Sequence, residues 1–158
     1  MINVRVLFVC LGNICRSPTA HGVFLKVLSD NGLIAKVEVD SAGTHAHHIG
    51  EAPDPRSQKV ALGRGVDLSE LRARKVKPSD YGHYDYILAM DNENLDILNS
   101  DCPVEHREKV KLFLEFAVNR KEREVPDPYY GGAGGFDHVL DLVEAASLGL
   151  LEEIRANN

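Results

Sequence analysis

The chain has 158 residues, 44% of them hydrophobic and 27% charged, which suits one soluble globular domain with its own core. No stretch approaches the roughly 20 apolar residues of a transmembrane helix, no signal peptide opens the chain, and a net charge of −6 argues against binding nucleic acid or anionic membranes. We therefore expect a single domain over residues 1–158, located in the cytoplasm. We also expect a monomer or a weak homodimer.

The N-terminal part of the chain indicates a strand, a helix and a second strand. Residues 4–10 form a short, β-branched apolar run, which is typical of a central strand covered on both faces. Ser17 and Pro18 then predict the start of a helix, with Ser17 as its N-cap, and the helix should end near Gly32. Residues 37–41 indicate a second strand, so these segments form a βαβ unit with parallel strands.

Helices continue along the rest of the chain. Asp54, followed by Pro55, repeats the signal of a cap and a proline, and predicts a helix that ends around residues 63–65. From about Gly135 onward, apolar residues recur at helical spacing, so the chain should end in an amphipathic helix.

Two more strands are expected between these helices. They cover residues 84–90 and 109–113, and Asp91 is placed to cap the helix that follows the first of them. Strands that alternate with helices predict an α/β fold. We expect three layers, with a central four-stranded parallel sheet, helices on both faces and a phosphate loop at the end of the first strand.

The loop between the first strand and the first helix carries the clearest chemical signal. Cys10 ends the strand, and ligands of α/β folds bind at the carboxyl ends of strands. Arg16 offers a planar fork that matches two phosphate oxygens. Gly12 and Asn13 tolerate the left-handed backbone angles of a tight loop whose amides point at an anion. The segment therefore predicts a phosphate cradle made of Cys10, Leu11, Gly12, Asn13, Ile14, Cys15, Arg16 and Ser17.

Cys10 is the candidate nucleophile of this cradle. The backbone amides, the Arg16 guanidinium and the N-terminal end of the helix dipole all favour its thiolate form. Ser17 can donate a hydrogen bond to that thiolate, and later to the sulfur as it leaves phosphorus. The odd count of three cysteines also fits reduced thiols better than a disulfide framework.

Residues 9–18, Val-Cys-Leu-Gly-Asn-Ile-Cys-Arg-Ser-Pro, resemble the signature of the low-molecular-weight protein tyrosine phosphatases. The resemblance extends through residues 40–44 and 53–56, and returns at residues 90–91 and 127–130. It implies hydrolysis of phosphotyrosine and aryl phosphate monoesters through a phospho-cysteine intermediate, with no cofactor. It also implies that the partners of the protein are substrates that carry phosphotyrosine.

The resemblance assigns the role of general acid to Asp127, which protonates the leaving phenolate and later activates water. It places Tyr129 and Tyr130 along the slot for the substrate ring, although packing against the terminal helix is an equal alternative for Tyr130. Asn13 and Ser41 are expected to belong to the hydrogen-bond network that supports the phosphate loop.

Two further features leave alternatives open. The family pattern implies a reversible disulfide between Cys15 and Cys10, and a simple packing role for Cys15 is the alternative. The cluster of His45, His47 and His48 has no matching ligand pair at recognisable spacing, so we expect no metal. We expect this loop to form one rim of the pocket, with His47 in it.

Three other functions share parts of this pattern. Protein-arginine phosphatases of the same fold carry Thr where this chain has Ile14, so Ile14 and the tyrosine pair favour an aryl substrate. An arsenate reductase needs two further cysteines downstream of the loop, and this chain has only Cys102 there. A phosphate-binding module without activity would have lost Cys10 or Asp127, and both are present.

Overall fold

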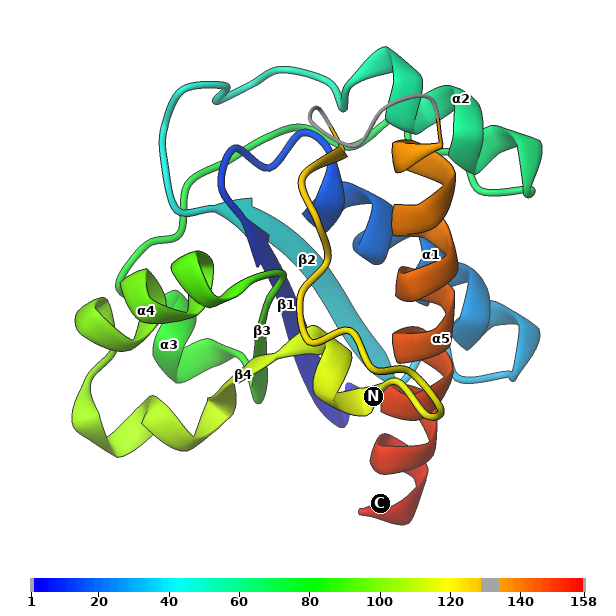
Figure 1. Ribbon diagram of the computed structural model, residues 1–158. Helices are drawn as coiled ribbons and strands as arrows, with labels where there is room; N and C mark the ends of the chain where they lie inside the picture. The colour runs from blue at the N-terminus through cyan, green and yellow to red at the C-terminus, as the bar shows by residue number, and fades with distance from the viewer. Residues whose placement is uncertain (1, 129–133, 158) are drawn as a thin grey trace.

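The computed structural model describes residues 2–128 and 134–157, and it is built around a parallel sheet (Figure 1). The sheet has four strands in the order β2-β1-β3-β4, and every neighbouring pair is parallel. The strands are β1 (Val4–Cys10), β2 (Val37–Gly43), β3 (Tyr86–Ala89) and β4 (Val110–Leu112).

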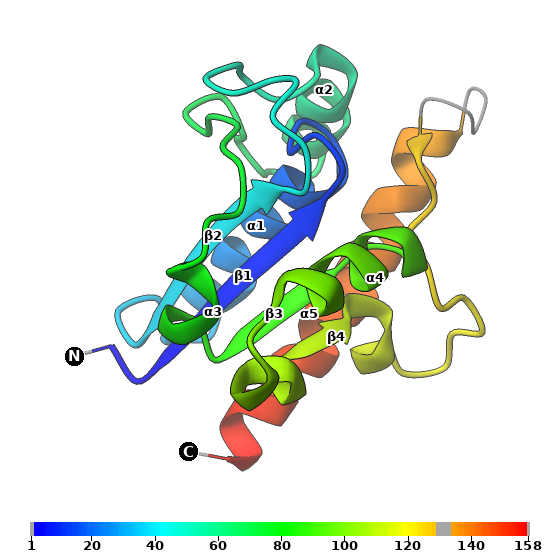
Figure 2. The ribbon, with the colours of Figure 1, turned by 90° about the vertical axis from the view of Figure 1, so that its left-hand side faces the viewer.

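Helices cover both faces of this sheet (Figures 1 and 2). One face is covered by α1 (Arg16–Asp30) and α5 (Gly135–Ala156), and α2 (Pro55–Gly63) packs against these two helices. The other face is covered by α3 (Asp80–His83) and α4 (Asn92–Asp101). Two 3-10 helices flank β4, namely η1 (Val104–Lys109) and η2 (Phe113–Phe116). The predicted fold class, a three-layer α/β domain with a four-stranded parallel sheet, is confirmed.

The central strand β1 supplies side chains to both cores, because successive residues of a strand point to opposite faces. Phe8 packs edge-to-face against Phe24 of α1 and Phe113 of η2, with ring centroids 5.8 and 4.9 Å apart. Cys10 belongs to the same cluster, whereas Leu7 belongs to the cluster on the opposite face. Burial on both sides explains the unbroken apolar run that the sequence shows at this strand.

Two predicted helix caps are confirmed. The carboxylate of Asp54 accepts a hydrogen bond of 2.8 Å from the backbone of Arg56 at the start of α2. The carboxylate of Asp91 accepts one of 2.8 Å from the backbone of Asn94 at the start of α4. Each cap satisfies a backbone N–H that has no partner within its helix.

The predicted cap of α1 is wrong. The helix begins at Arg16 with Cys15 at the N-cap position, and no side chain caps it. The hydroxyl of Ser17 instead lies 3.0 Å from the sulfur of Cys10. The phosphate loop therefore curls directly into the helix, and its own geometry determines where the helix starts.

The sheet topology places Cys10 at a point where the strand order reverses. The chain runs from β1 to β2 on one side and then crosses to β3 on the other side of β1. The connections that follow β1 and β3 therefore diverge, and a crevice forms above the strand ends. In the described residues, no helix combines the length and the apolar character needed to cross a bilayer.

Candidate active site

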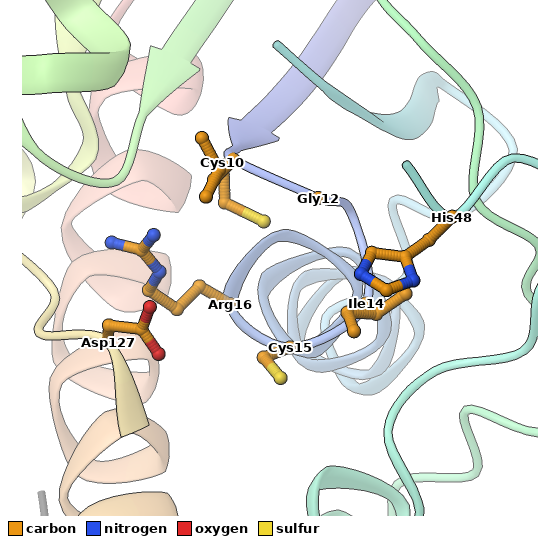
Figure 3. A pocket seen from close by; sticks show the side chains of 8 residues that line it. Cys10, Gly12, Ile14, Cys15, Arg16, His48 and Asp127 are labelled. Atoms are coloured by element: carbon orange, nitrogen blue, oxygen red, sulfur yellow. The ribbon is translucent and has the colours of Figure 1, made fainter. Parts of the chain in front are cut away.

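The loop between β1 and α1 borders a pocket of about 300 Å³ (Figure 3). In Figure 3, Arg16 and Asp127 lie on one side of the pocket and His48 lies on the other. The structure thus brings together side chains from three distant segments. The residues that line the pocket are Cys10, Leu11, Gly12, Ile14, Cys15, Arg16, His48 and Asp127.

Asn13, rather than Gly12, has the left-handed backbone that the loop requires, with a φ of 59°. Its side chain holds this shape, because Oδ1 accepts from the backbone of Arg74 at 3.0 Å and Nδ2 donates to Ser17 Oγ at 2.8 Å. Gly12 instead lies beneath the ring of His48. A Cβ there would lie 2.9 Å from Cδ2 of His48, which packs across it.

The end of β2 supports the loop from behind. A Cβ on Gly43 would lie 2.8 Å from the carbonyl oxygen of Leu11, so only glycine allows the two backbones to come so close. Just beyond it, Thr44 N–H donates to Cys10 O at 2.9 Å and His45 N–H donates to Leu11 O at 3.0 Å. The role of Gly43 was not predicted, although it lies within residues 40–44 of the family pattern.

Cys10 is buried at the floor of the pocket, 3.0 Å from Ser17 Oγ. Because Ser17 Oγ accepts from Asn13, its own hydrogen can point at the sulfur of Cys10 or at the carbonyl of Ala42, which lies 3.4 Å away. The sulfur is the nearer acceptor, so the arrangement suits a thiolate that receives a hydrogen bond.

Arg16 is 5% exposed and is held by two oxygens. Its Nη1 donates to Asp91 Oδ2 at 2.6 Å and to Val125 O at 3.1 Å. Burial lowers the pKa of Arg16, but the neighbouring Cys10 and Asp91 outweigh burial, and the net pKa lies above its ordinary value. Asp91 was predicted only as a helix cap, so its contact with Arg16 is a role that the sequence did not indicate.

Asp127 follows an anchored segment. The backbone N–H of Val125 donates to Met90 O at 2.7 Å, just beyond β3, and the Val125 side chain is fully buried. Asp127 itself is half-buried and lines the pocket on the side of Arg16 (Figure 3). The carboxylate therefore faces the space above Cys10, where a leaving group would be.

Cys15 also lines the pocket, but its thiol differs in character from a nucleophile. Burial raises the pKa of Cys15 to about 12. A hydrogen bond with Ser57 lowers this pKa, but the effect of burial is larger. The thiol is therefore protonated at neutral pH. Cys10, Cys15 and Cys102 are all free thiols here. The reversible disulfide between Cys10 and Cys15 stays a prediction.

His48 lines the pocket, whereas His47 is not among its described lining residues, and the place of His47 on the rim stays a prediction. The His48 Nδ1 lies 2.8 Å from Glu51 Oε2, and its ring covers Gly12. His47 is exposed and stacks on His45, with ring centroids 5.5 Å apart. The space left by Gly12 accepts the ring of His48.

The remaining predicted residues lie away from the pocket or outside the described part of the chain. The Ser41 hydroxyl lies 3.0 Å from Nδ1 of His21 on α1, so its hydrogen bond joins β2 to that helix rather than to the loop. Tyr129 and Tyr130 fall outside residues 2–128 and 134–157, and their place along the slot stays a prediction. Within those same ranges, no three His, Cys, Asp or Glu side chains gather as potential metal ligands.

Comparison with known proteins identifies the family. A family profile described as low molecular weight phosphotyrosine protein phosphatase matches residues 5–158. The enzyme of that name from Schizosaccharomyces pombe is 47% identical to this chain, over 90% of this chain and 92% of its own length. The enzyme of that name from Homo sapiens is 41% identical, over 94% of this chain and 94% of its own length. A crystal structure of a protein tyrosine phosphatase from Entamoeba histolytica, with Hepes in the active site, superposes with a TM-score of 0.95 at 42% identity, covering 98% of this chain and 99% of that one. The chain belongs to the low-molecular-weight phosphotyrosine protein phosphatase family.

Proposed function

We propose that this chain hydrolyses phosphotyrosine in proteins, and aryl phosphates, through a phosphorylated Cys10. One observation carries the proposal, namely that the Cys10 sulfur shares a pocket with Arg16 and Asp127 and lies 3.0 Å from Ser17 Oγ. A nucleophile, a cation for the phosphate and a proton donor are the groups that transfer of a phosphoryl group to cysteine needs. Membership of the family supports the same reaction.

In the first step, the phosphate of the substrate binds in the loop and Cys10 attacks it. Arg16 Nη1 is engaged by Asp91 and Val125, so Nε and Nη2 are the donors directed at the phosphate oxygens. The S–P bond forms as the bond from phosphorus to the tyrosine oxygen breaks. Asp127 gives its proton to that oxygen, so tyrosine leaves as a neutral phenol.

In the second step, Asp127 acts as a base. Its carboxylate takes a proton from water while the water oxygen attacks phosphorus, and the S–P bond breaks. The sulfur leaves as a thiolate, which the hydrogen bond from Ser17 stabilises. Inorganic phosphate is released, and Cys10 and Asp127 return to their initial protonation states.

The pocket also supports an aryl group as the substrate. The side chain of Ile14 lines it and provides an apolar wall beside the bound phosphate. We further propose that residues 1–158 act as one catalytic domain, since the family profile spans residues 5–158. A cytoplasmic location and a monomeric or weakly dimeric state belong to the same proposal.

The proposal is tested with a panel of substrates and one substitution. The native chain should release phosphate from p-nitrophenyl phosphate and from phosphotyrosine peptides, with much less from phosphoserine peptides. Cys10→Ser should abolish turnover. If the native chain is inactive on aryl phosphates, or Cys10→Ser retains full activity, the proposal is wrong. Activity confined to phosphoarginine peptides would support the arginine phosphatase instead.

A second substitution tests the acid. Asp127→Ala should lower the rate by about 10²–10⁴ for phenyl phosphate, whose leaving group needs a proton. The loss should be smaller for p-nitrophenyl phosphate, which leaves readily as an anion. Equal losses on the two esters would contradict the role of Asp127.

A further inference from the structure

Asp54 connects the start of α2 to the phosphate loop. Its backbone N–H donates to the carbonyl oxygen of Ile14 at 2.8 Å. Its carboxylate caps α2 and is only 6% exposed. A buried carboxylate requires a cationic or hydrogen-bonding partner, so the residue that pairs with Asp54 helps to fix this junction.

Arg56 is one such partner, and it extends the connection to α5. Its Nε and Nη2 donate to the two carboxylate oxygens of Asp54 at 3.2 and 3.0 Å, which is the bidentate geometry that a guanidinium favours. The central carbon of the same guanidinium lies 4.8 Å from the centroid of the Phe136 ring. Arg56 therefore makes an ion pair on α2 and a cation–π contact with α5.

Phe136 belongs to the first turn of α5. This turn lies against Pro128, the residue that follows Asp127. A Cβ on Gly135 would lie 3.1 Å from Pro128 O and 3.6 Å from Pro128 Cα. Figure 1 shows the start of α5 close to α2 and to the end of the segment that carries Asp127. The place where α5 begins therefore determines where Pro128, and with it Asp127, can lie.

Asp127 thus has an anchor on each side. On the N-terminal side, Val125 bonds to Met90 at 2.7 Å and accepts from Arg16 at 3.1 Å. On the C-terminal side, the anchor is the contact between Pro128 and the start of α5. Of these two anchors, the second is the one that Arg56 reaches, through Phe136.

We propose, building on the function proposed above, that Arg56 is a positioning residue for Asp127. Through Asp54 and Phe136 it fixes the start of α5 relative to the phosphate loop, so that the acid faces the leaving oxygen of a bound ester. Among the described residues, Arg56 is not one that lines the pocket. Its effect should therefore appear in proton delivery rather than in phosphate binding.

The test compares kcat/KM for phenyl phosphate and p-nitrophenyl phosphate. This constant reports the steps up to cleavage of the P–O bond. Proton donation by Asp127 matters more in these steps for phenyl phosphate, because phenolate is a more basic leaving group than p-nitrophenolate. Arg56→Met keeps the aliphatic stem without the charge, and Phe136→Leu removes the π face. Each should lower kcat/KM for phenyl phosphate about 10-fold more than for p-nitrophenyl phosphate. Arg56→Lys, which keeps a cation, should recover part of the loss.

Arg64 supplies a matched control. It also joins α2 to α5, donating to Asp141 at 2.7 Å and to Glu144 at 3.0 Å, but it lies at the other end of α2. Arg64→Met should leave the ratio of the two kcat/KM values unchanged, although it should lower thermal stability about as much as Arg56→Met does. In an Asp127→Ala background, Arg56→Met should not change that ratio further.

Three results would overturn the inference. Arg56→Met could affect both esters equally, Arg64→Met could produce the same change in ratio, or the effect of Arg56→Met could persist without Asp127. If the native chain is active on both esters, any of these results would overturn the inference about Arg56 and leave the proposed function unaffected. A native chain inactive on both esters would overturn the proposed function and this inference together.

Discussion

Arg16 and Asp91 form a partly buried ion pair, with 2.6 Å between Nη1 and Oδ2, across a sequence separation of 75 residues. The other carboxylate oxygen, Oδ1, accepts from Asn94 N–H and caps α4. One side chain therefore both starts a helix and orients the guanidinium at the pocket. These two roles use different oxygens, so substitutions can separate them.

Asp91→Ser should separate orientation of Arg16 from helix capping. Serine caps helices well but cannot form the ion pair, so we expect kcat/KM for p-nitrophenyl phosphate to fall about 10- to 100-fold. Asp91→Ala should show the same kinetic loss and an additional loss of about 1 kcal/mol in the free energy of unfolding. Steady-state kinetics and urea denaturation measure the two effects. Full activity of Asp91→Ser would show that the ion pair does not orient Arg16.

Ser17→Ala should slow the reaction of Cys10 with iodoacetate at neutral pH. The hydroxyl lies 3.0 Å from the sulfur, and a hydrogen bond to a charged group contributes about 1.5–3 kcal/mol, so a loss of about 10-fold in rate is expected. Peptide mass spectrometry follows the alkylation. Ser57→Ala serves as the control, because Ser57 bonds to Cys15 instead. Equal rates for Ser17→Ala and the native chain would refute the contact.

Gly43→Ala should disturb the phosphate loop. The new Cβ would lie 2.8 Å from the carbonyl oxygen of Leu11, which belongs to backbone and cannot move alone. We expect a loss of about 1–3 kcal/mol in the free energy of unfolding and weaker inhibition by inorganic phosphate. Gly63→Ala, with nothing within 4 Å of its Cβ, should be neutral or slightly stabilising. Similar losses for the two variants would argue against a steric cause.

Cys15 should make the fold less stable at alkaline pH. Its pKa is raised from 9.0 to about 12 by burial, so above pH 9.0 the unfolded chain loses this proton while the folded chain keeps it. Stability therefore falls with rising pH, by at most about 1.4 kcal/mol per pH unit. The stability difference between the native chain and Cys15→Ala should shrink by about 1 kcal/mol from about pH 8.5 to about pH 10. A constant difference in urea denaturation would contradict the raised pKa.

His48→Ala and His47→Ala should differ in their effect on peptide substrates. His48 lines the pocket, so its removal takes away one wall and should raise KM for a phosphotyrosine peptide, in line with about 0.5–1.5 kcal/mol of ring contact. His47 is exposed and stacks on His45, so its removal should leave KM unchanged. The reverse order of effects would favour His47 over His48 as the rim residue.

The sequence predicts the fold of this chain well where the signals are local. The apolar run of β1, the caps Asp54 and Asp91, and the terminal helix are each set by residues close in the chain. The third strand proved shorter than predicted, because the N–H of Tyr84 bonds to Asp80 O and continues α3. Such short helices carry little periodic signal.

The site could be predicted only in part, because local spacing indicates some of its residues and the tertiary structure determines the others. Cys10 and Arg16 lie in one loop, so their spacing alone indicates the phosphate cradle. The partner of Arg16 depends on the order of the strands, which brings Asp91 from the end of β3 to the end of β1. The choice between His47 and His48 depends on the space above Gly12, and no local pattern encodes that space.

The reversal of strand order at β1 has a consequence for how such a phosphatase can diversify. The bond-breaking groups of the loop come from the connection after β1, whereas His48 comes from the connection after β2 and Asp127 from the one after β4. The walls of the pocket thus belong to separate stretches of chain. Exchanges in residues 46–52, between the bonds that His45 N–H and Asp54 N–H make to the phosphate loop, can change which phosphoproteins fit while leaving Cys10 and Arg16 untouched. The nucleophile and the phosphate cradle thus lie on a different stretch of chain from the His48 wall, on a rigid scaffold that tolerates variation in its loops.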